Sequence, residues 1–431
     1  MHKVSTLFII LVFLFFSLQS AGAEEVLTWQ DCIKEAALNH PDLISAAENI
    51  NQKKADKAIT ASGLYPEIDS NLNASTASTS TTSSTTGVTT KTTTDTYTYG
   101  VTGTQLIFDG FNTINKTKSA SENINAAGQN YRFTSTQVRL NLRTAFISLL
   151  KAQELIRVAE EITRIRRDSL ELITLRYESG LEHKGALLTA EANLAEATFE
   201  LAQAKRDVGL AQRQLTKEMG RKEFQPMSAK GDFSVRDAAS DKPDVEALAK
   251  NNPSLLEAFA KRNAAAFDIK SAYAEFAPAL SGEAGANKKS SHWPPQNDNW
   301  NLGLSLTMPI FEGGLRFAQV SKAQAAYNQA EADARSIRDS VVVNLEKTWV
   351  DLQDTMETVE VQRKALNAAE ERSKIAEAQY STGFIIFDNW IIIENDLVSA
   401  KKAYLNAQAN ALLAEANWVS AKGETLEYAQ K

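Results

Sequence analysis

The chain has 431 residues and a formal net charge of -7, with 46 Lys and Arg against 53 Asp and Glu. It contains no basic cluster of the kind that follows a phosphate backbone, which argues against nucleic-acid binding. The four histidines form no spaced metal-ligand set, and the sequence has neither a glycine-rich phosphate loop nor a nucleophile beside a base. We therefore expect no metal, no cofactor and no enzyme activity.

Residues 1–23 have the pattern of a secretory signal peptide. His2 and Lys3 precede an apolar run from Leu7 to Leu18, and Ala21-Gly22-Ala23 supplies the small residues that signal peptidase reads. A membrane-spanning helix needs roughly 20 apolar residues, so we expect cleavage rather than an anchor. Cys32 is the only cysteine, so the signal holds no lipobox cysteine and no intrachain disulfide can form.

The rest of the chain reads as two copies of one unit. Matching segments recur in the same order, first at an offset of 212 positions and then at an offset of 203: Asn39–Leu43 with Asn251–Leu255, Ile107–Gly110 with Ile310–Gly313, and Tyr177–Gly180 with Tyr380–Gly383. We predict a first repeat over residues 24–219, an irregular connector over 220–243 and a second repeat over 244–431. Each repeat is expected to run helix, strand, loop, strand, very long helix, glycine turn and helix.

Each repeat opens with a predicted helix. The first helix is expected from Thr28 to Leu64, with Thr28 and Asp31 available as caps and Pro66 ending it. Its counterpart is expected from Val245 to Phe276, ended by Pro278.

Four segments alternate between apolar and polar residues, as β-strands with one buried or lipid-facing side do. The clearest are Tyr97–Thr104 and Trp300–Met308, and the weaker ones are Ile68–Ala74 and Leu280–Ala286. A soluble sandwich would also alternate. However, the polar faces are small and hydrophilic, as a water-filled lumen requires, and Tyr97 and Trp300 stand at strand ends, as at a membrane interface. Four strands cannot close a barrel alone, so we expect the chain to oligomerise or to bury its strand edges elsewhere.

The segment Ser75–Thr96 is nearly all Ser and Thr, with Lys91 and Asp95 as its only charged residues. It cannot build a core, and we predict a flexible external loop. A glycosylated stalk is the alternative.

Two very long helices are predicted, from Asn112 to Tyr177 and from Leu315 to Tyr380, because both segments lack proline. At 1.5 Å per residue, about 66 residues give a helix of about 100 Å. Their apolar residues follow the 3-4 spacing of a coiled coil. The alanine-rich segments Leu187–Met219 and Ile391–Ala421 are expected to pack back against them as antiparallel partners.

Each long helix must reverse at a glycine, Gly180 in the first repeat and Gly383 in the second. A glycine at a helix end needs no functional explanation. It does not explain the apolar residues around it that we expect to be exposed, which are Leu181, Phe384, Ile385, Ile386 and Phe387. We predict that these two tips contact a partner. The predicted contact residues are Tyr177, Ser179, Gly180, Leu181, Tyr380, Ser381, Gly383 and Phe384.

The stretches LIFDGF and PIFEGG, at residues 106–111 and 309–314, each join a strand to a long helix. Pro309 removes a hydrogen-bond donor where the sheet ends, an acid favours a helix N-terminus, and glycine permits the bend. A plain strand-to-helix turn would explain one copy but not two. The predicted junction residues are Phe108, Asp109, Gly110, Pro309, Phe311, Glu312 and Gly313.

With its duplicated halves, the paired junctions and the two Tyr-x-x-Gly tips, the chain resembles the TolC-like outer membrane efflux protein family over essentially its mature length. The resemblance implies an α+β membrane protein that is a homotrimer. Three chains would pool four strands each into a 12-stranded transmembrane β-barrel, continuous with an antiparallel α-helical coiled-coil tunnel across the periplasm. It also implies that periplasmic adaptor proteins of inner-membrane transporters dock at the tips.

One part of the family pattern is missing. Well-studied members carry acids six and nine positions after the second tip glycine, where they form a constriction. Those positions here are Asn389 and Ile392, and the nearest acids are Asp388 and Glu394. The resemblance therefore implies a constriction near Asp388, Asn389 and Ile392 without the usual acids. The first tip also departs, with His183-Lys184-Gly185-Ala186 where an Asp is common.

The leading hypothesis is a passive exit duct in the outer membrane of a Gram-negative cell, with most of its mass in the periplasm. It would carry cargo for drug or metal efflux or for type I secretion. The alternative is a structural or adhesive coiled-coil surface protein without a pore. The sequence does not name the cargo.

Overall fold

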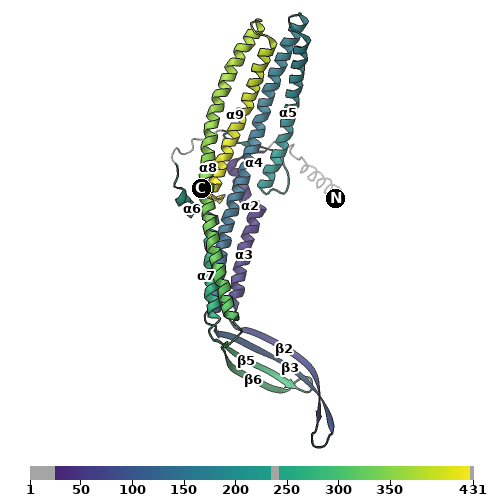
Figure 1. The fold of residues 1–431 in the computed structure, drawn as a ribbon. Coiled ribbons are helices and arrows are strands. Elements are labelled where there is room, and N and C mark those ends of the chain that lie inside the picture. Colours follow the sequence, from purple (N-terminus) through teal and green to yellow (C-terminus); the bar gives the residue numbers. More distant parts are fainter. Residues whose placement is uncertain (1–24, 234–241, 428–431) are drawn as a thin grey trace, which may run out of the picture. The chain divides into compact units, whose positions relative to one another are not determined.

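The computed structural model describes residues 25–233 and 242–427 (Figure 1). The predicted signal peptide lies outside the described residues, as does part of the connector. The described chain divides into two compact units. Within the described residues, unit 1 takes those up to Ala46, those between Tyr131 and Pro253 and those from Asp339 onward, and unit 2 takes Ala47–Asn130 and Ser254–Arg338. Each unit therefore draws on both halves of the sequence.

The helix that opens each predicted repeat is in fact two helices. The first is α2 (Trp29–Asn39) followed by α3 (Pro41–Ser62), and the second is α6 (Val245–Lys250) followed by α7 (Pro253–Ala274). The prediction of single helices was wrong because proline lacks the N–H that would continue the preceding helix and keeps the residue before it out of the helical region. The predicted cap is confirmed: Thr28 and Asp31 form a reciprocal capping box at the start of α2.

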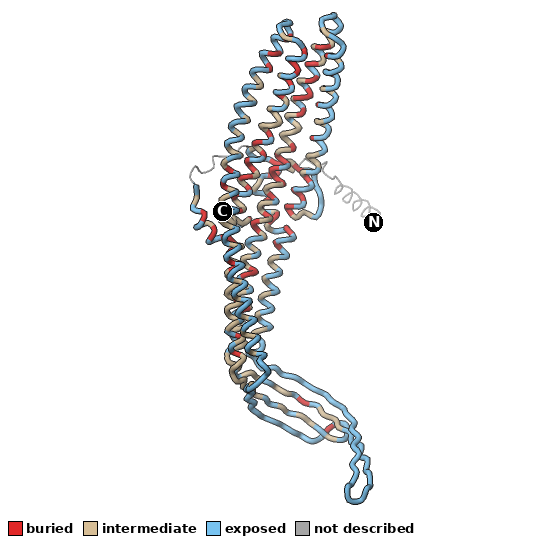
Figure 2. Tube along the Cα trace, viewed as in Figure 1, coloured by how far each residue is buried: buried red, intermediate tan, exposed pale blue. Residues whose placement is uncertain are grey.

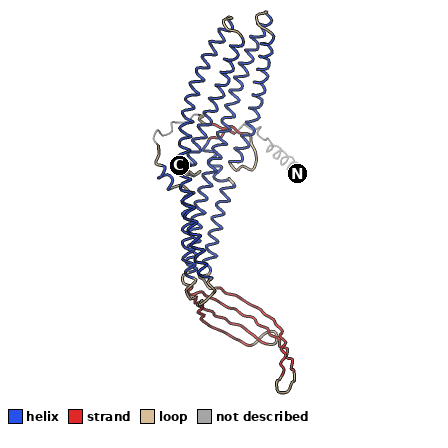
Figure 3. Tube along the Cα trace, in the orientation of Figure 1, coloured by secondary structure: helices blue, strands red, loops and turns tan. Residues whose placement is uncertain are grey.

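The two very long helices are confirmed. They are α4 (Asn112–Glu178) and α8 (Leu315–Ser381), each of 67 residues. The returning helices are α5 (Lys184–Glu218) and α9 (Phe387–Ala421). Within the described residues, no helix is both long and apolar enough to cross a membrane. Helices make up nearly all of unit 1 (Figure 3).

The cores of unit 1 follow the predicted 3-4 spacing. Leu142, Phe146 and Leu149 of α4 are buried in one cluster, and Leu345, Trp349 and Leu352 of α8 are buried in another. Trp349 packs against Trp418 of α9 with ring centroids 5.3 Å apart. The seam that the sequence predicted is therefore the surface on which α4 and α8 meet their neighbours.

The connector was predicted to be irregular, but it contains a short strand, β4 (Met227–Lys230). This strand pairs in parallel with β1 (Glu25–Thr28). Arg221 reinforces the pairing, because its guanidinium donates to both carboxylate oxygens of Glu25, at 2.7 and 3.0 Å, and also to Glu35. A four-residue strand carries too little alternation to be recognised in the sequence, and its partner lies about two hundred residues away.

Unit 2 contains a four-stranded antiparallel sheet in the order β2-β3-β5-β6 (Figure 1). The strands are β2 (Glu67–Thr82), β3 (Thr89–Phe108), β5 (Ala279–Ser290) and β6 (Asn297–Thr307). Strand β2 pairs only with β3, and β6 pairs only with β5, so the outer edge of each has no partner strand in the described chain. Figure 2 shows β2 and β6 exposed along their whole length, whereas β3 and β5 contain both exposed and intermediate residues, so in the single chain the sheet has almost no core of its own.

The predicted flexible loop Ser75–Thr96 is mostly a β-ribbon, so that prediction was wrong. Strands β2 and β3 pair regularly from the residue pair Ser75 and Thr96 to the residue pair Thr82 and Thr89. This hairpin extends beyond β5, whose outermost pair with β3 is Ser290 with Tyr97. Threonine is β-branched and favours extended backbone even without a core to cover. It follows that Tyr97 and Trp300 lie inside their strands rather than at the ends.

Candidate functional sites

The first hairpin tip ends α4 with a glycine cap. Gly180 has a φ of +71°, and the Leu181 amide donates to the Arg176 carbonyl at 2.8 Å, while the Gly180 amide donates to the Tyr177 carbonyl at 3.0 Å. These two bonds satisfy carbonyls that a helix end leaves unpaired. They leave the side chains of Tyr177, Ser179 and Leu181 on the surface.

The second tip repeats the first bond for bond. Gly383 has a φ of +81°, and the amides of Phe384 and Gly383 donate to the carbonyls of Gln379 and Tyr380 at 2.8 and 3.0 Å. Phe384 is 84% exposed. Ser381 is exposed as well. The two tips therefore share one backbone design, and both present apolar side chains to solvent.

Not every predicted tip residue is on the surface. Tyr380 is fully buried, and Phe387, predicted to be exposed, is buried as well. The Tyr380 ring stacks on Trp390 with centroids 4.5 Å apart and planes within 7°. Phe387 and Trp390 are one turn apart on α9, so both project towards α8. Tyr380 and Phe387 therefore form the buried packing beneath the second tip rather than part of its exposed surface.

The same cluster joins the two tips to each other. The Tyr380 hydroxyl donates to Glu182 of the first tip at 2.8 Å. Arg176 lies 4.7 Å from the Tyr380 ring centroid and donates to its carbonyl at 3.3 Å. Burial raises the pKa of Tyr380, and the hydrogen bond to Glu182 raises it further. Sequence reasoning missed Arg176, Glu182 and Trp390. The i, i+3 spacing of Phe387 and Trp390 was the one available signal for a buried face.

The predicted constriction residues lie in the first turns of α9. Asp388, Asn389 and Ile392 are all exposed. Glu394, the other nearby acid, is buried and accepts a hydrogen bond of 2.6 Å from Ser373. Burial raises the pKa of Glu394 above its ordinary value. Asp388 is therefore the acid that this segment presents to solvent.

The first strand-to-helix junction is tightly packed. Asp109 caps α4, because its carboxylate accepts bonds from the Thr113 amide and hydroxyl at 2.7 and 2.6 Å. Gly110 has a φ of +68°, and a Cβ there would collide with Ala277 Cβ and with the Ala274 carbonyl oxygen. Phe108 packs edge-on against the Phe111 ring at 5.5 Å.

The second junction is open by comparison. Strand β6 ends at Thr307, two residues before Pro309. Gly313 has a φ of +59° with open space where a Cβ would point. Glu312 pairs with Arg316, Oε2 to Nε, at 2.5 Å instead of capping the helix with its side chain. Phe311 is 88% exposed. The two junctions therefore share a sequence pattern but differ in packing.

The register places most of the apolar residues of the four strands on one face of the sheet. Ile68, Gly103, Ala284 and Leu302 are cross-strand neighbours, and so are Ser70, Val101, Ala286 and Trp300. The opposite face carries Asp69, Thr102, Gly285 and Asn301 in one row. On β6, Trp300, Leu302, Leu304 and Leu306 are all exposed, with Trp300 at 81%. One face of the sheet is therefore apolar and uncovered, and the other is polar.

Within the part of the chain that the structure describes, no group of three or more His, Cys, Asp or Glu residues could hold a metal ion. The candidate sites described above are two helical tips, two junctions and a two-faced sheet.

Known proteins resemble this chain over most of its length. Outer membrane efflux protein BepC of Brucella suis is 22% identical over 412 residues, which cover 94% of this chain and 86% of that protein. Outer membrane protein TolC of Escherichia coli is 25% identical over 342 residues, covering 74% of this chain and 68% of that protein. The open state of the Neisseria gonorrhoeae MtrE outer membrane channel superposes with a TM-score of 0.80 at 18% identity, covering 93% of this chain and 90% of that one.

The similarity to the solved structure shows a shared fold. The match to a family model adds evidence from the sequence. The model of the outer membrane efflux proteins matches residues 32–221 and 245–424, which is most of the chain. These two matched segments contain both tips, both junctions and all four strands of the sheet. The chain therefore belongs to the outer membrane efflux protein family.

Proposed function

We propose that this protein is the passive exit duct of a tripartite export system in the outer membrane of a Gram-negative cell. Three identical chains would pool their four-stranded sheets into a 12-stranded barrel, and the helices would form a tunnel on the periplasmic side. Energy would come from an inner-membrane transporter, reached through a periplasmic adaptor protein. Residues 1–23 would be removed as a signal peptide during export.

The observation that carries this proposal is the sheet of unit 2. Its face bearing Ile68, Val101, Leu302 and Trp300 is apolar and exposed, which costs free energy in water and favours insertion in lipid. Its opposite face is polar, as a water-filled lumen requires. Strands β2 and β6 leave open edges, and a barrel closed by three chains would pair β6 of one chain with β2 of the next.

The second junction supports the same assembly. Ile310 and Phe311 are 95% and 88% exposed in the single chain, and Phe108 and Phe111 of the first junction, although packed against each other, are partly exposed as well. Large apolar side chains next to a membrane-facing sheet are expected to be covered by lipid or by a neighbouring chain. We assign the six junctions of a trimer to the boundary between barrel and tunnel.

The tips are the proposed adaptor contacts. Leu181, Phe384 and Ile386 are exposed apolar side chains on turns whose backbone bonds are already satisfied. Their exposure has no role in the fold of the single chain, so we assign it to partner contact. Asp388, Asn389 and Ile392 are proposed to line the narrowest part of the tunnel.

The test is a measurement of conductance. Purified protein should require detergent for extraction, should run as a trimer after chemical crosslinking, and should open ion-conducting steps in a planar lipid bilayer. A structural or adhesive coiled-coil protein would bind surfaces without conducting. Purified trimers that fail to insert or to conduct would reject the duct and favour that alternative.

A further inference from the structure

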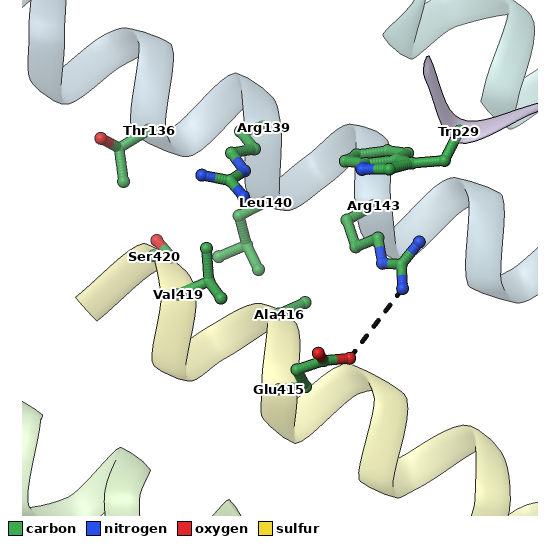
Figure 4. Close-up of a pocket in the computed structure, with 9 residues that line it drawn as sticks. All are labelled: Trp29, Thr136, Arg139, Leu140, Arg143, Glu415, Ala416, Val419 and Ser420. Carbon is green, nitrogen blue, oxygen red and sulfur yellow. Dashed lines mark ion pairs between the residues drawn. The ribbon is translucent and has the colours of Figure 1, made fainter. Parts of the chain in front are cut away.

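A small pocket lies in unit 1 between α4 and α9, next to the first residue of α2 (Figure 4). Its volume is about 130 Å³. It shares no lining residue with the tips or the junctions described above. Arg139 and Arg143 enter it from α4, Val419 and Ser420 enter it from α9, and the Trp29 ring lies beside it.

Two aromatic rings contact the guanidinium of Arg143, and its N–H groups donate no hydrogen bond to the described residues. Its guanidinium lies 5.0 Å from the Trp29 ring centroid and 6.0 Å from that of Phe146, so two aromatic side chains fix its position. Its one ion pair is with Glu415 at 3.9 Å, which is longer than a hydrogen bond. Among the described residues, Arg143 makes no hydrogen bond through its guanidinium, and Glu415 is its nearest ion-pair partner.

Burial of Arg143 makes those free donors significant. The arginine side chain is 24% exposed, and burial lowers the pKa of its guanidinium while Glu415 acts in the opposite direction. Arginine nevertheless keeps its charge in proteins, so a half-buried cation here has a carboxylate at ion-pair distance, Glu415, but no anion hydrogen-bonded to it. A buried charge is costly unless it is paired, and that favours binding of an anion.

The neighbouring charges leave room for one negative group. Arg139 uses a single nitrogen, Nη1, to reach Glu424 at 2.9 Å and the Thr425 carbonyl at 3.3 Å. Lys422 also pairs with Glu424, at 2.5 Å. The ion pairs around the pocket thus involve Arg139, Arg143 and Lys422 against Glu415 and Glu424, which leaves one excess positive charge.

Part of the wall is apolar. Leu140, Ala416 and Val419 line the pocket together with the Trp29 ring, and Thr136 and Ser420 each add a hydroxyl. A cavity of about 150 Å³ holds a benzene ring, so this one is close to the size of a small ring or a branched aliphatic group. We propose that this pocket binds a small monoanionic carboxylate on an apolar or aromatic body, with its carboxylate on the Arg143 fork.

The same contacts disfavour inorganic phosphate. Arginine forks fit both carboxylate and phosphate. A dianion, however, would lie close to the carboxylates of Glu415 and Glu424 and would place polar oxygens against Leu140, Ala416 and Val419. The site therefore selects one negative charge joined to apolar surface.

The test uses the full chain in detergent, with benzoate as the probe and isothermal titration or ligand-observed NMR as the readout. Wild-type protein should bind benzoate saturably. Arg143→Gln should weaken binding at least tenfold, because it removes the charge and the fork. Val419→Phe should weaken it to a similar extent by filling the pocket while leaving Arg143 in place. The matched control is Arg157→Gln, on the exposed face of α4, which should bind as wild type does.

Benzyl alcohol and inorganic phosphate serve as comparison probes, and each should bind at least tenfold more weakly than benzoate. Thermal unfolding of every variant shows whether the fold is intact, and Val419→Phe supplies the test if Arg143→Gln does not fold. The proposal is overturned if wild-type protein shows no saturable benzoate binding, if folded pocket variants bind as tightly as wild type, or if benzyl alcohol binds as well as benzoate. Channel conductance is a separate measurement, so either proposal can fail alone.

Discussion

The Tyr380 hydroxyl donates a 2.8 Å hydrogen bond to Glu182, and this single contact joins residues 198 positions apart at the ends of the two helical hairpins. Tyr380 is also stacked on Trp390 and contacted by Arg176, so the tyrosine holds the second tip together and ties it to the first. The tips are therefore mechanically coupled within one chain.

Removing the Tyr380 hydroxyl should loosen the tips without unfolding them. Tyr380→Phe keeps the stack on Trp390 but loses the bond to Glu182, and a hydrogen bond to a charged group contributes about 1.5–3 kcal/mol. Amides around both tips should exchange with solvent at least tenfold faster in hydrogen-exchange mass spectrometry. Tyr177→Phe, on the exposed side of the first tip, is the control. Equal exchange in both variants would show that the bond does not hold the tips.

Proline at the second tip should separate docking from insertion. Gly383 has a φ of +81°, and its amide donates to Tyr380, whereas proline fixes φ near −65° and has no N–H. We predict that Gly383→Pro, like Gly180→Pro, abolishes export while trimer formation and membrane insertion persist. Gly128→Ala is the matched control, because Gly128 lies within α4 with open space around it. Wild-type export by both proline variants would remove the support for docking at the tips.

The two junctions should respond differently to the same substitution. Gly110→Ala would force a Cβ into Ala277 and the Ala274 carbonyl at a positive φ, so we predict a loss of several kcal/mol and poor yield of folded protein. Gly313→Ala meets no atom and should cost only about 1–2 kcal/mol of left-handed strain. Thermal unfolding of both variants side by side measures the difference. Equal losses would contradict the packing difference between the junctions.

Glu394 should make stability fall as pH rises. Burial raises its pKa above the ordinary 4.5, so the folded state holds this proton more tightly than the unfolded state. The free energy of unfolding therefore decreases as pH rises from 4.5 through the folded pKa. Glu394→Gln, which can still accept from Ser373, should raise the melting temperature at pH 7.5, and the gain should vanish towards pH 4.5. Asp388→Gln, on the exposed face, should not show this pattern.

Cys32 should be inert in the folded protein. It is fully buried in the unit 1 core, and burial raises the pKa of its thiol to about 12. Thiolate is the reactive form, so a maleimide at pH 7.5 should not label native protein but should label it fully in guanidinium. Rapid labelling without denaturant would show that the contact between α2 and α4 opens.

Much of the fold could be read directly from the sequence. The limits of α4 and α8 came out within one residue, because a proline-free segment with 3-4 spacing and a terminal glycine states its structure locally. The helix breaks at Pro41 and Pro253 also have local causes, so missing both of them was an error of interpretation. The Ser75–Thr96 ribbon was misread because weak hydrophobicity was taken as disorder, whereas β-branched threonine favours extended backbone.

The candidate sites could be only partly predicted. The positions of both tip glycines and both junctions followed from turn chemistry. The burial of Tyr380 and Phe387 did not, because it depends on Trp390 packing behind them. Arg143 gave no sequence signal at all, since its free donors are evident only once Trp29 and α9 are in place.

The sequence by itself determined where the long helices and their returning partners lie, because those limits depend on neighbours a few residues away: caps, prolines, glycines and the period of apolar residues. Only the tertiary structure decided which of those residues meet. The contacts of Tyr380 with Glu182, of Arg221 with Glu25, and of β1 with β4 each join segments about two hundred residues apart. Such pairings are set by how whole elements pack, and no local pattern encodes that packing.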